Sequence, residues 1–318
     1  MRHFRLKFLT FLLVSFLIIV SIFICEFILR FVGLGDPVIY DKNPVWNYSL
    51  SENQNRIRFN NKTVKTNNVG LRSNKDWINN EKTLILFHGD SVTYGGSKLD
   101  NSELFSEKIC KDLGENFICG NAGVNAYGVL NMVMRSKYDD RIKDSNVVIF
   151  TVILQDFLRG LTHIKQLSFL TSSPNKFFPA IEEILNFIAW KYDLNTYLAK
   201  KSSDKESSRK QDVENMTNKA LDFALQMLNN EILRLESENK KVFVFFSPTK
   251  NSLSNNQSEL NKNLKKKILM NVLNIYDMTS TINKNLNKKI YYDNVHFNDR
   301  GHEIISEIIS QHIKDKLK

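Results

Sequence analysis

The sequence has few of the residues that build metal centres or disulfide frameworks. Only three of its 318 residues are cysteines, and no two of them form a Cys-x-x-Cys pair. Such pairs supply many structural zinc sites and dithiol redox sites, so the sequence indicates neither. Proline and glycine are also scarce, with 5 and 12 residues, and no long low-complexity tract is present. These absences exclude a collagen-like or disordered chain, and the 42% hydrophobic content predicts a well-buried core.

The cysteines leave one structural question open. Cys25 lies in an apolar N-terminal run, whereas Cys110 and Cys119 are close together in the sequence. Two separate buried thiols are the simpler expectation. A disulfide is the alternative, and it requires that the domain lie in an oxidising compartment.

The positive charge has no nucleic-acid motif beside it. The formal net charge is +10, and the densest basic run covers residues 262–267. The lysines are otherwise scattered, so we expect a solvated helix face and no nucleic-acid partner. An anionic membrane surface or an acidic substrate such as a charged polysaccharide remains the alternative partner.

A long hydrophobic run follows the first few residues. Residues 8–25 are almost entirely apolar, which is long enough to span a bilayer as a helix. Arg2, Arg5 and Lys7 precede the run, so the positive-inside rule places the N-terminus in the cytoplasm. The sequence therefore predicts a single-pass membrane anchor over residues 1–35, with the rest of the chain in the periplasm or at the cell surface.

Two other kinds of N-terminal segment fit less well. A cleaved signal peptide has a shorter apolar core and a small-residue cleavage site, and no such site follows this run. A lipoprotein signal needs a small residue before the modified cysteine, whereas Ile24 precedes Cys25. Both remain alternatives to the uncleaved anchor.

The rest of the chain divides into two parts. Residues 36–81 are polar and rich in Asn and Asp, and we interpret them as a juxtamembrane segment that packs on the main domain, with short β-like stretches such as 56–59. From residue 82 to 318, apolar runs alternate with amphipathic helical patterns, which indicates a parallel sheet covered on both faces. The predicted strands are 83–87, 116–119, 147–153, 241–246, 274–278 and 290–292, and the predicted helices are 104–113, 220–235 and 303–313.

Residues 160–213 interrupt this alternation. They contain an aromatic, partly helical stretch and then a charged run. We interpret them as a helical insertion that forms a lid or cap, followed by an exposed loop. An ordinary crossover helix with a long linker is the alternative.

The residues after the first strand of this domain are candidates for catalysis. The sequence there reads His88-Gly89-Asp90-Ser91, and the C-terminal ends of parallel strands are where α/β sheets build their sites. A glycine permits a sharp turn, and a following helix would direct free N–H groups toward Ser91. The non-catalytic alternative is a turn in which the serine only caps the following helix.

A serine needs a base to act as a nucleophile. Asp293 and His296 lie three residues apart between the last predicted strand and the last helix. At this spacing the carboxylate can orient the imidazole while the other ring nitrogen faces Ser91. His302 lies one turn inside the terminal helix, so we expect it to have a packing or capping role.

A developing oxyanion needs hydrogen-bond donors. The backbone N–H of Ser91 is one candidate. The backbone N–H of Gly123 is a second, because a glycine lets the backbone approach the substrate closely. The side-chain amide of Gln155, which follows the third strand, is a third candidate.

Taken in order, these pieces resemble the SGNH (GDSL-type) hydrolase superfamily. Gly89-Asp90-Ser91 is similar to its first block, Gly123 within NAGVNAYG to its second, and Asp293-x-x-His296 to its last. The resemblance covers roughly residues 82–315. One block departs from the pattern: where the family has Gly-x-Asn-Asp, this chain has Ile153-Leu154-Gln155-Asp156, so Gln155 stands in place of the oxyanion-hole Asn.

The resemblance implies a fold and a function. The fold is a flavodoxin-like three-layer α/β/α sandwich with a five-stranded parallel sheet, without a metal or an organic cofactor. The function is a serine esterase or deacylase that uses a Ser-His-Asp triad and removes an acyl group such as acetyl from surface or exported carbohydrate. An O-acyltransferase acting on a cell-envelope polysaccharide and a non-catalytic glycan-binding or assembly factor are the alternatives. Asp90, Asn125 and Asp156 are expected near the site without an assigned role.

Overall fold

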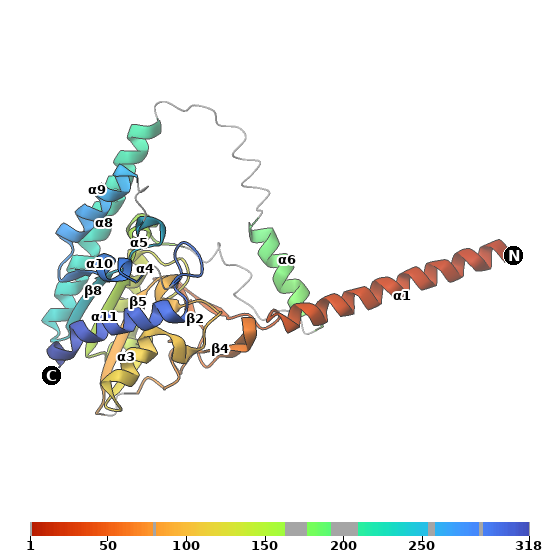
Figure 1. Ribbon diagram of the computed structural model, residues 1–318, viewed down its shortest axis with the longest axis horizontal. Coiled ribbons are helices and arrows are strands. Elements are labelled where there is room, and N and C mark those ends of the chain that lie inside the picture. The colour runs from red at the N-terminus through yellow and green to blue at the C-terminus, as the bar shows by residue number, and fades with distance from the viewer. Residues whose placement is uncertain are drawn as a thin grey trace.

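A five-stranded parallel sheet organises the main domain of the computed structural model (Figure 1). The structure describes residues 2–78, 81–162, 177–191, 209–253, 258–285 and 289–317. The strand order is β6-β5-β7-β8-β9, and every neighbouring pair is parallel. The strands are β5 (Thr83–Gly89), β6 (Phe117–Asn121), β7 (Val147–Val152), β8 (Lys241–Phe246) and β9 (Ile275–Asp277).

Helices cover both faces of this sheet. Val148, Phe150 and Val152 of β7 pack in one core cluster with α4, α8 and α9. Val147 and Ile149 pack in a second cluster with α3, α10 and α11, because successive strand residues point to opposite faces. The predicted three-layer α/β/α fold is therefore confirmed. The covering helices are α3 (Phe105–Leu113), α4 (Val129–Tyr138), α8 (Arg209–Ser237), α9 (Glu259–Asn271), α10 (Thr279–Asn283) and α11 (Asp299–Leu317).

Two antiparallel hairpins precede the sheet. The side chains of Tyr40, Tyr48 and Leu50 are buried in the core cluster that contains α4 and α8. The Tyr48 hydroxyl donates to the carbonyl of Asn125. The rings of Tyr48 and Tyr127 pack against each other, with 5.2 Å between their centroids. The hairpin strands are β1 (Tyr40–Asn43) with β2 (Asn47–Leu50), and β3 (Asn55–Arg58) with β4 (Lys62–Lys65).

Arg72 joins this N-terminal segment to the loop after β5. Its side chain is fully buried, and its guanidinium donates to the carbonyls of Tyr94, Gly96 and Leu99 at 2.5–2.6 Å. Its Nε also donates to Asn101 at 3.0 Å. The segment before the sheet thus holds the turn that carries the expected nucleophile.

The structure corrects two sequence interpretations, the first at residues 290–292. They form no strand: only an isolated bridge pairs Tyr291 with Phe297, and the N–H of Tyr292 donates to the carbonyl of His296 at 2.8 Å. Ile290 is buried, but Tyr292 is 48% exposed, so the segment turns back on itself instead of extending the sheet.

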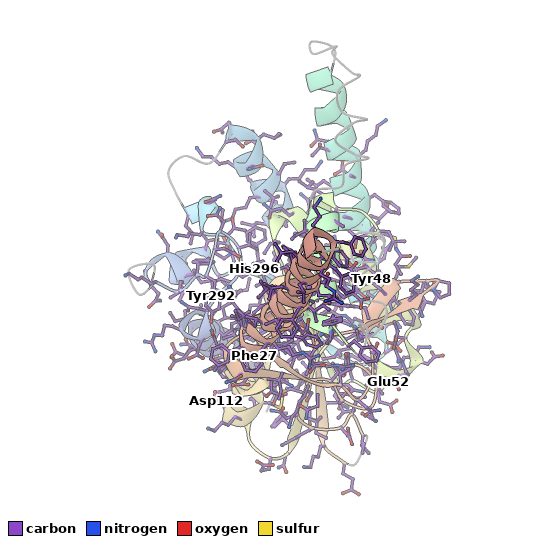
Figure 2. All side chains as sticks on the ribbon, turned by 90° about the vertical axis from the view of Figure 1, so that its right-hand side faces the viewer. Phe27, Tyr48, Glu52, Asp112, Tyr292 and His296 are labelled. Carbon is purple, nitrogen blue, oxygen red and sulfur yellow. A yellow bond between two sulfur atoms is a disulfide. The ribbon has the colours of Figure 1, made fainter. Side chains whose placement is uncertain are left out.

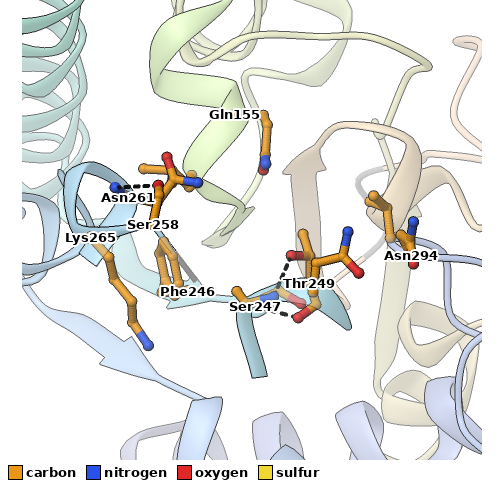
Figure 3. A pocket seen from close by; sticks show the side chains of 12 residues that line it. Gln155, Phe246, Ser247, Thr249, Ser258, Asn261, Lys265 and Asn294 are labelled. Carbon is orange, nitrogen blue, oxygen red and sulfur yellow. Dashed lines mark hydrogen bonds between the residues drawn. The ribbon is translucent and has the colours of Figure 1, made fainter. Parts of the chain in front are cut away.

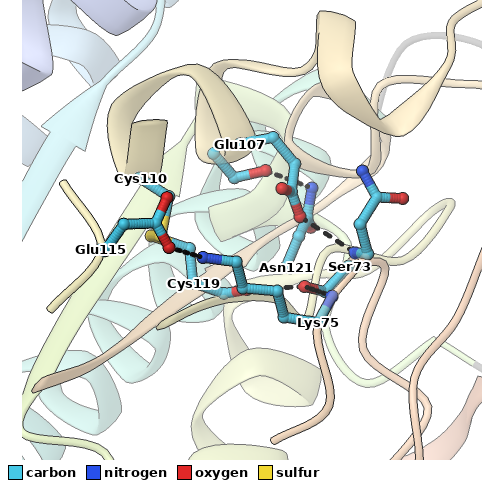
Figure 4. The surroundings of a disulfide bond; sticks show 9 residues. Ser73, Lys75, Glu107, Cys110, Glu115, Cys119 and Asn121 are labelled. Carbon is cyan, nitrogen blue, oxygen red and sulfur yellow. Dashed lines mark hydrogen bonds and ion pairs between the residues drawn. A yellow bond between two sulfur atoms is a disulfide. The ribbon is translucent and has the colours of Figure 1, made fainter. Parts of the chain in front are cut away.

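The second correction concerns the cysteines. Cys110 of α3 and Cys119 of β6 form a disulfide with a Cα–Cα distance of 5.7 Å (Figure 4). The expectation of two separate thiols is therefore wrong. The parallel sheet places α3 against β6, which sequence spacing alone does not determine.

The predicted helical insertion is described only in part. Its described residues are 160–162, 177–191, which include α6 (Pro179–Lys191), and the start of α8. The rest of the insertion lies outside the described residues. Phe178, Ala180 and Ile181 contact the N-terminal helix, so α6 packs against that helix.

The N-terminal helix, α1 (Arg2–Phe31), projects away from the sheet (Figure 1). Its apolar part, Phe4–Phe31, covers 28 residues and contains an 18-residue window with a mean hydropathy of 2.9, so the helix is long and apolar enough to cross a membrane.

Candidate active site

Ser91 lies at the C-terminal edge of the sheet, where the chain leaves β5. Gly89 ends this strand, and a Cβ atom there would lie 1.9 Å from Thr93 Oγ1 and 2.8 Å from the carbonyl oxygen of Thr151. Only glycine therefore permits this close approach. Because β6 and β7 pair with β5 on opposite sides, the turn lies at the point where the order of the strands reverses, which is where open α/β sheets form their sites.

The short helix α2 (Ser91–Tyr94) fixes the direction of the serine. The Asp90 carboxylate accepts from the N–H of Val92 at 2.8 Å and caps this helix. The N–H of Ser91 takes part in none of the hydrogen bonds found among the described residues. It is therefore available to a ligand beside the Ser91 hydroxyl.

The structure brings Ser91, His296 and Asp293 together. His296 Nε2 lies 2.9 Å from Ser91 Oγ, although 205 positions separate the two residues. His296 Nδ1 lies 2.7 Å from Asp293 Oδ2. This arrangement assigns one ring nitrogen to the carboxylate and leaves the other for the serine proton, as general-base activation requires.

The Asp293 carboxylate also holds the backbone of its own loop. Its Oδ1 accepts from the N–H groups of Val295 and His296 at 2.7 and 2.8 Å. Partial burial opposes the ionisation of Asp293, but these hydrogen bonds and the one from the His296 ring outweigh it and lower its pKa to about 2. Asp293 is therefore an anion at neutral pH and can stabilise a protonated His296.

A buried group of charges lies behind Ser91. Arg159 Nη1 donates to Asp90 Oδ2 at 3.0 Å, to Asp156 Oδ1 at 2.9 Å and to the carbonyl of Tyr127. The two carboxylates are fully buried. Burial and the neighbouring charge of Asp90 raise the pKa of Asp156 well above its ordinary value. The Ser91 turn and the helix α5 (Leu154–Leu158) are thereby joined through one guanidinium.

The backbone N–H of Gly123 is already engaged. It donates to Asn121 Oδ1 at 2.8 Å, and the Asn121 amide in turn donates to the carbonyl of Thr93 at 2.6 Å. In this conformation Gly123 is not free to bind an oxyanion. A Cβ atom there would lie 2.4 Å from the backbone nitrogen of Tyr94, so glycine is required at this position.

Two other N–H groups of the same loop are free. Among the described residues, no acceptor is found for the N–H of Asn125 or of Ala126. Ala126 has a φ of +62°, which is uncommon for a residue other than glycine and reorients the backbone at that point. This conformation could not be predicted from the sequence, because alanine does not mark a left-handed position.

Gln155 lines a cavity of about 620 Å³ beside the His296 loop. Its lining also includes Asn294 and Val295, the two residues before His296. Figure 3 shows the Gln155 amide directed into this cavity. Its side chain makes none of the hydrogen bonds found among the described residues, so the amide is available to a ligand.

Sequence reasoning missed Ser247. It follows β8 at the same edge of the sheet, lines the cavity and is completely buried. Its hydroxyl has no partner among the described residues. Ser247 follows a strand, as Ser91 and Gln155 do, so its position after β8 is the sequence signal that could have identified it. Arg159 had no comparable signal, because its role depends on two carboxylates from different segments.

Two further predicted residues have local partners. The Asn125 side chain donates to the hydroxyl of Tyr40 at 2.8 Å, so its amide contacts the first hairpin. His302 is buried, accepts from the N–H of Phe105 at 3.2 Å and stacks on the ring of that residue. Burial lowers the His302 pKa to about 3, which suits a neutral packing residue.

Comparisons with known proteins concern the fold. No protein-family model matches the sequence, and no curated protein matches it. The structure is similar to a two-domain esterase active on acetylated mannans, with 16% sequence identity and a TM-score of 0.43. That match covers 74% of this chain and 50% of the other, so the chain spans half the length of that relative.

Two further solved structures show the same level of similarity. One is an acetylxylan esterase from Geobacillus stearothermophilus, with 16% identity, a TM-score of 0.44 and coverage of 73% of this chain and 94% of the other. Another is a member of the lipolytic G-D-S-L family from Veillonella parvula, with 16% identity, a TM-score of 0.38 and coverage of 71% and 94%. These similarities stand beside the resemblance to GDSL-type hydrolases that the motifs predict. The roles of individual residues rest on the geometry of this chain.

Proposed function

We propose that the chain is a membrane-anchored serine esterase that removes acyl groups, such as acetyl, from carbohydrate outside the cytoplasm. The observation that carries this proposal is the continuous hydrogen-bond chain from Asp293 through His296 to Ser91. The residues come from opposite ends of the domain, and their contacts have the order that general-base activation of a serine requires.

Acylation follows from this order. Ser91 Oγ attacks the ester carbonyl carbon while its proton passes to His296 Nε2. The carbonyl electron pair moves to oxygen and forms an oxyanion, for which the N–H of Ser91 and the Gln155 amide are the proposed donors. His296 then gives its proton to the leaving sugar oxygen, the bond from carbon to that oxygen breaks, and the acyl group stays on Ser91.

Deacylation repeats these steps with water. His296 takes a proton from water, the resulting hydroxide attacks the acyl carbon, and the proton returns to Ser91 Oγ as the carboxylic acid leaves. The side chains of His296 and Asp293 are 39% and 56% exposed, so water reaches the base directly. This exposure favours hydrolysis over acyl transfer to a second sugar, which is the alternative use of the same acyl-enzyme.

The cavity beside Gln155 supports a hydroxylated substrate. Its lining includes amide and hydroxyl groups from Gln155, Ser247 and Asn294. The cation in its wall, Lys265, is already paired with Asp277 at 3.1 Å. A neutral, hydrogen-bonding group such as a sugar ring therefore matches this lining better than a free anion does.

Two features support a position outside the cytoplasm. The Cys110–Cys119 disulfide is typical of oxidising compartments. Glu26, near the end of α1, is 5% exposed and accepts from the N–H groups of Ala180 and Ile181. Removal of α1 by cleavage would eliminate these contacts, so they favour an uncleaved anchor.

The test uses full-length protein in lipid nanodiscs with acetylated oligosaccharides and with p-nitrophenyl acetate. We expect release of acetate by the wild type and none above background by Ser91→Ala. An added unacetylated oligosaccharide distinguishes the two reactions, because its acetylation would identify a transferase. If folded wild type turns over neither ester, the proposal of an esterase is wrong.

Ser247 tests the carbohydrate part of the proposal separately. Ser247→Ala is expected to raise KM for the acetylated oligosaccharide several-fold and to leave the hydrolysis of p-nitrophenyl acetate unchanged. Ser252→Ala is the matched control, because this cavity serine already donates to the carbonyl of Thr249 at 2.7 Å. Equal effects of Ser247→Ala on both esters would exclude the cavity as the sugar site.

A further inference from the structure

The helix α6 is joined to α1 by a carboxylate. Glu26 accepts from the N–H of Ala180 at 3.1 Å and from that of Ile181 at 2.9 Å. These N–H groups belong to the first turn of α6, where no intrahelical acceptor exists, so the Glu26 side chain caps the helix. The ring of Phe23 also packs against that of Phe178 at 5.4 Å between centroids.

A second carboxylate joins α6 to the main domain. Glu183 pairs with the guanidinium of Arg58 at 2.5 and 3.1 Å, and both side chains are buried. Glu183 also accepts from the N–H of Gly35 at 2.7 Å. Two-point contact between a carboxylate and a guanidinium restricts orientation, so α6 is held at a defined angle to both α1 and the domain.

The other side of α6 is apolar and uncovered. Ile181, Ile184, Leu185 and Ile188 lie at positions i, i+3, i+4 and i+7, and so share one face of the helix. Leu185 is 59% exposed and Ile188 is 45% exposed. Glu183 lies on the opposite face, so the helix separates apolar from charged residues.

This apolar face borders a groove against α1. The groove has a volume of about 580 Å³, and its walls are residues of α1 between positions 14 and 29 together with Ile181, Ile184 and Leu185. A helix rises about 1.5 Å per residue and the hydrocarbon core is about 30 Å thick, so about 20 residues of α1 fill this core. The groove therefore opens along the part of α1 that a bilayer would surround.

We propose that α6 is a second membrane-contacting element, which lies in the interface of the leaflet on the domain side. Its apolar face and the groove are covered by lipid acyl chains. The proposal rests on the membrane anchoring proposed above. Amphipathic helices bind membranes in this way, with the apolar face buried at the boundary between headgroups and acyl chains.

The consequence concerns the position of the site. The contact between Arg58 and Glu183 joins the domain to α6, which lies on the membrane in this proposal. The orientation of the domain relative to the membrane is thereby restricted. The loop that carries His296 lies on the side of the domain from which α1 and α6 extend (Figures 1 and 2). The active site is thus presented to substrates at the membrane surface.

Spin-label accessibility tests this position of α6. A nitroxide is attached to Ile188→Cys in full-length protein with Cys25→Ser, in nanodiscs of phosphatidylethanolamine and phosphatidylglycerol. We expect the ratio of accessibility to oxygen over accessibility to a water-soluble nickel chelate to be several-fold higher than at Asn186→Cys. Asn186 is half-exposed and lies toward the polar side of the helix, so it is the matched control.

Two outcomes would overturn the proposal. Equal access of the nickel chelate to both labels would place α6 in water. Exclusion of both reagents from position 188 would mean that protein, either this chain or a second copy, covers the face. The same labels in a Ser91→Ala background should give unchanged ratios, so a failed esterase assay does not affect this result. The mass of the purified chain shows independently whether α1 is retained.

Discussion

Arg159 Nη1 lies 3.0 Å from Asp90 Oδ2 and within hydrogen-bonding distance of Asp156, directly behind the nucleophile turn. Two buried carboxylates thus share one cation. Each carboxylate also fixes a backbone segment, since Asp90 accepts from the N–H of Val92 and Asp156 from that of Ile153. The position of Ser91 therefore depends on the ion pairs of Arg159 with both Asp90 and Asp156.

Arg159→Leu is expected to destabilise the protein by about 3 kcal/mol at pH 7.5, because it leaves buried carboxylates without their cation. The cost should be smaller at pH 5.5. Burial and Asp90 raise the pKa of Asp156 in the folded state, and loss of the cation raises it further, so the folded variant holds a proton that the unfolded chain releases. Stability linked to that proton is present at low pH and is lost as the pH rises.

Urea unfolding of wild type and Arg159→Leu at both pH values measures this difference. Arg300→Leu is the control, since Arg300 pairs with Glu303 at the surface and should change stability by less than about 1 kcal/mol at either pH. A cost of Arg159→Leu that is as large at pH 5.5 as at pH 7.5 would contradict the account.

Asp293→Asn is expected to lower kcat by about 10³–10⁴-fold with little change in KM. The wild-type carboxylate has a pKa of about 2 and is charged throughout the working pH range, so the variant loses a permanent negative charge beside His296. Steady-state kinetics on p-nitrophenyl acetate measures the effect. Retention of more than a tenth of wild-type kcat would show that Asp293 does not orient the base.

Gln155→Ala is expected to lower kcat by about 10²–10³-fold, which is the effect of losing one oxyanion donor. Gln155→Asn keeps the amide on a shorter side chain and should retain more activity than alanine does. The two variants are compared on one ester with KM measured alongside. Wild-type kcat in Gln155→Ala would remove Gln155 from the oxyanion site and leave the backbone N–H groups of Ser91, Asn125 and Ala126.

Replacing Cys110 and Cys119 together by alanine is expected to lower the free energy of unfolding by about 2–3 kcal/mol, as the closure of a short loop implies. The two cysteines are 9 positions apart. Cys25→Ser should leave this free energy unchanged, because Cys25 is exposed and unpaired in the described part of the chain. Urea unfolding without reductant compares the three proteins, and equal stability of all three would mean that the bond does not constrain the unfolded chain.

The sequence predicted the sheet well because each strand carries its own signal. The run before His88 and the run over 147–153 are continuously apolar, and both are buried strands in the structure. The segment 290–292 was misassigned because three residues give too little periodicity to separate a strand from a turn. Its true role is to place His296, which only the packing of the domain determines.

The hydrogen-bond partners of individual polar groups could not be predicted from the sequence. The Gly123 N–H is satisfied by Asn121 two residues earlier, but the sequence does not tell which way that amide points. Glu26, within the apolar N-terminal helix, caps a helix 154 positions later. Neither contact follows from spacing or composition, because each depends on how separate elements pack.

The central claim is that His296 activates Ser91 as the nucleophile. Covalent labelling tests this claim most directly. Full-length wild type, Ser91→Ala and His296→Ala are incubated with a fluorophosphonate, and the labelled peptide is identified by mass spectrometry. We expect one adduct on Ser91 in the wild type, none in Ser91→Ala, and labelling slowed by at least about 10³-fold in His296→Ala. Labelling of Ser91 at the wild-type rate without His296, or an adduct on another residue, would contradict the account.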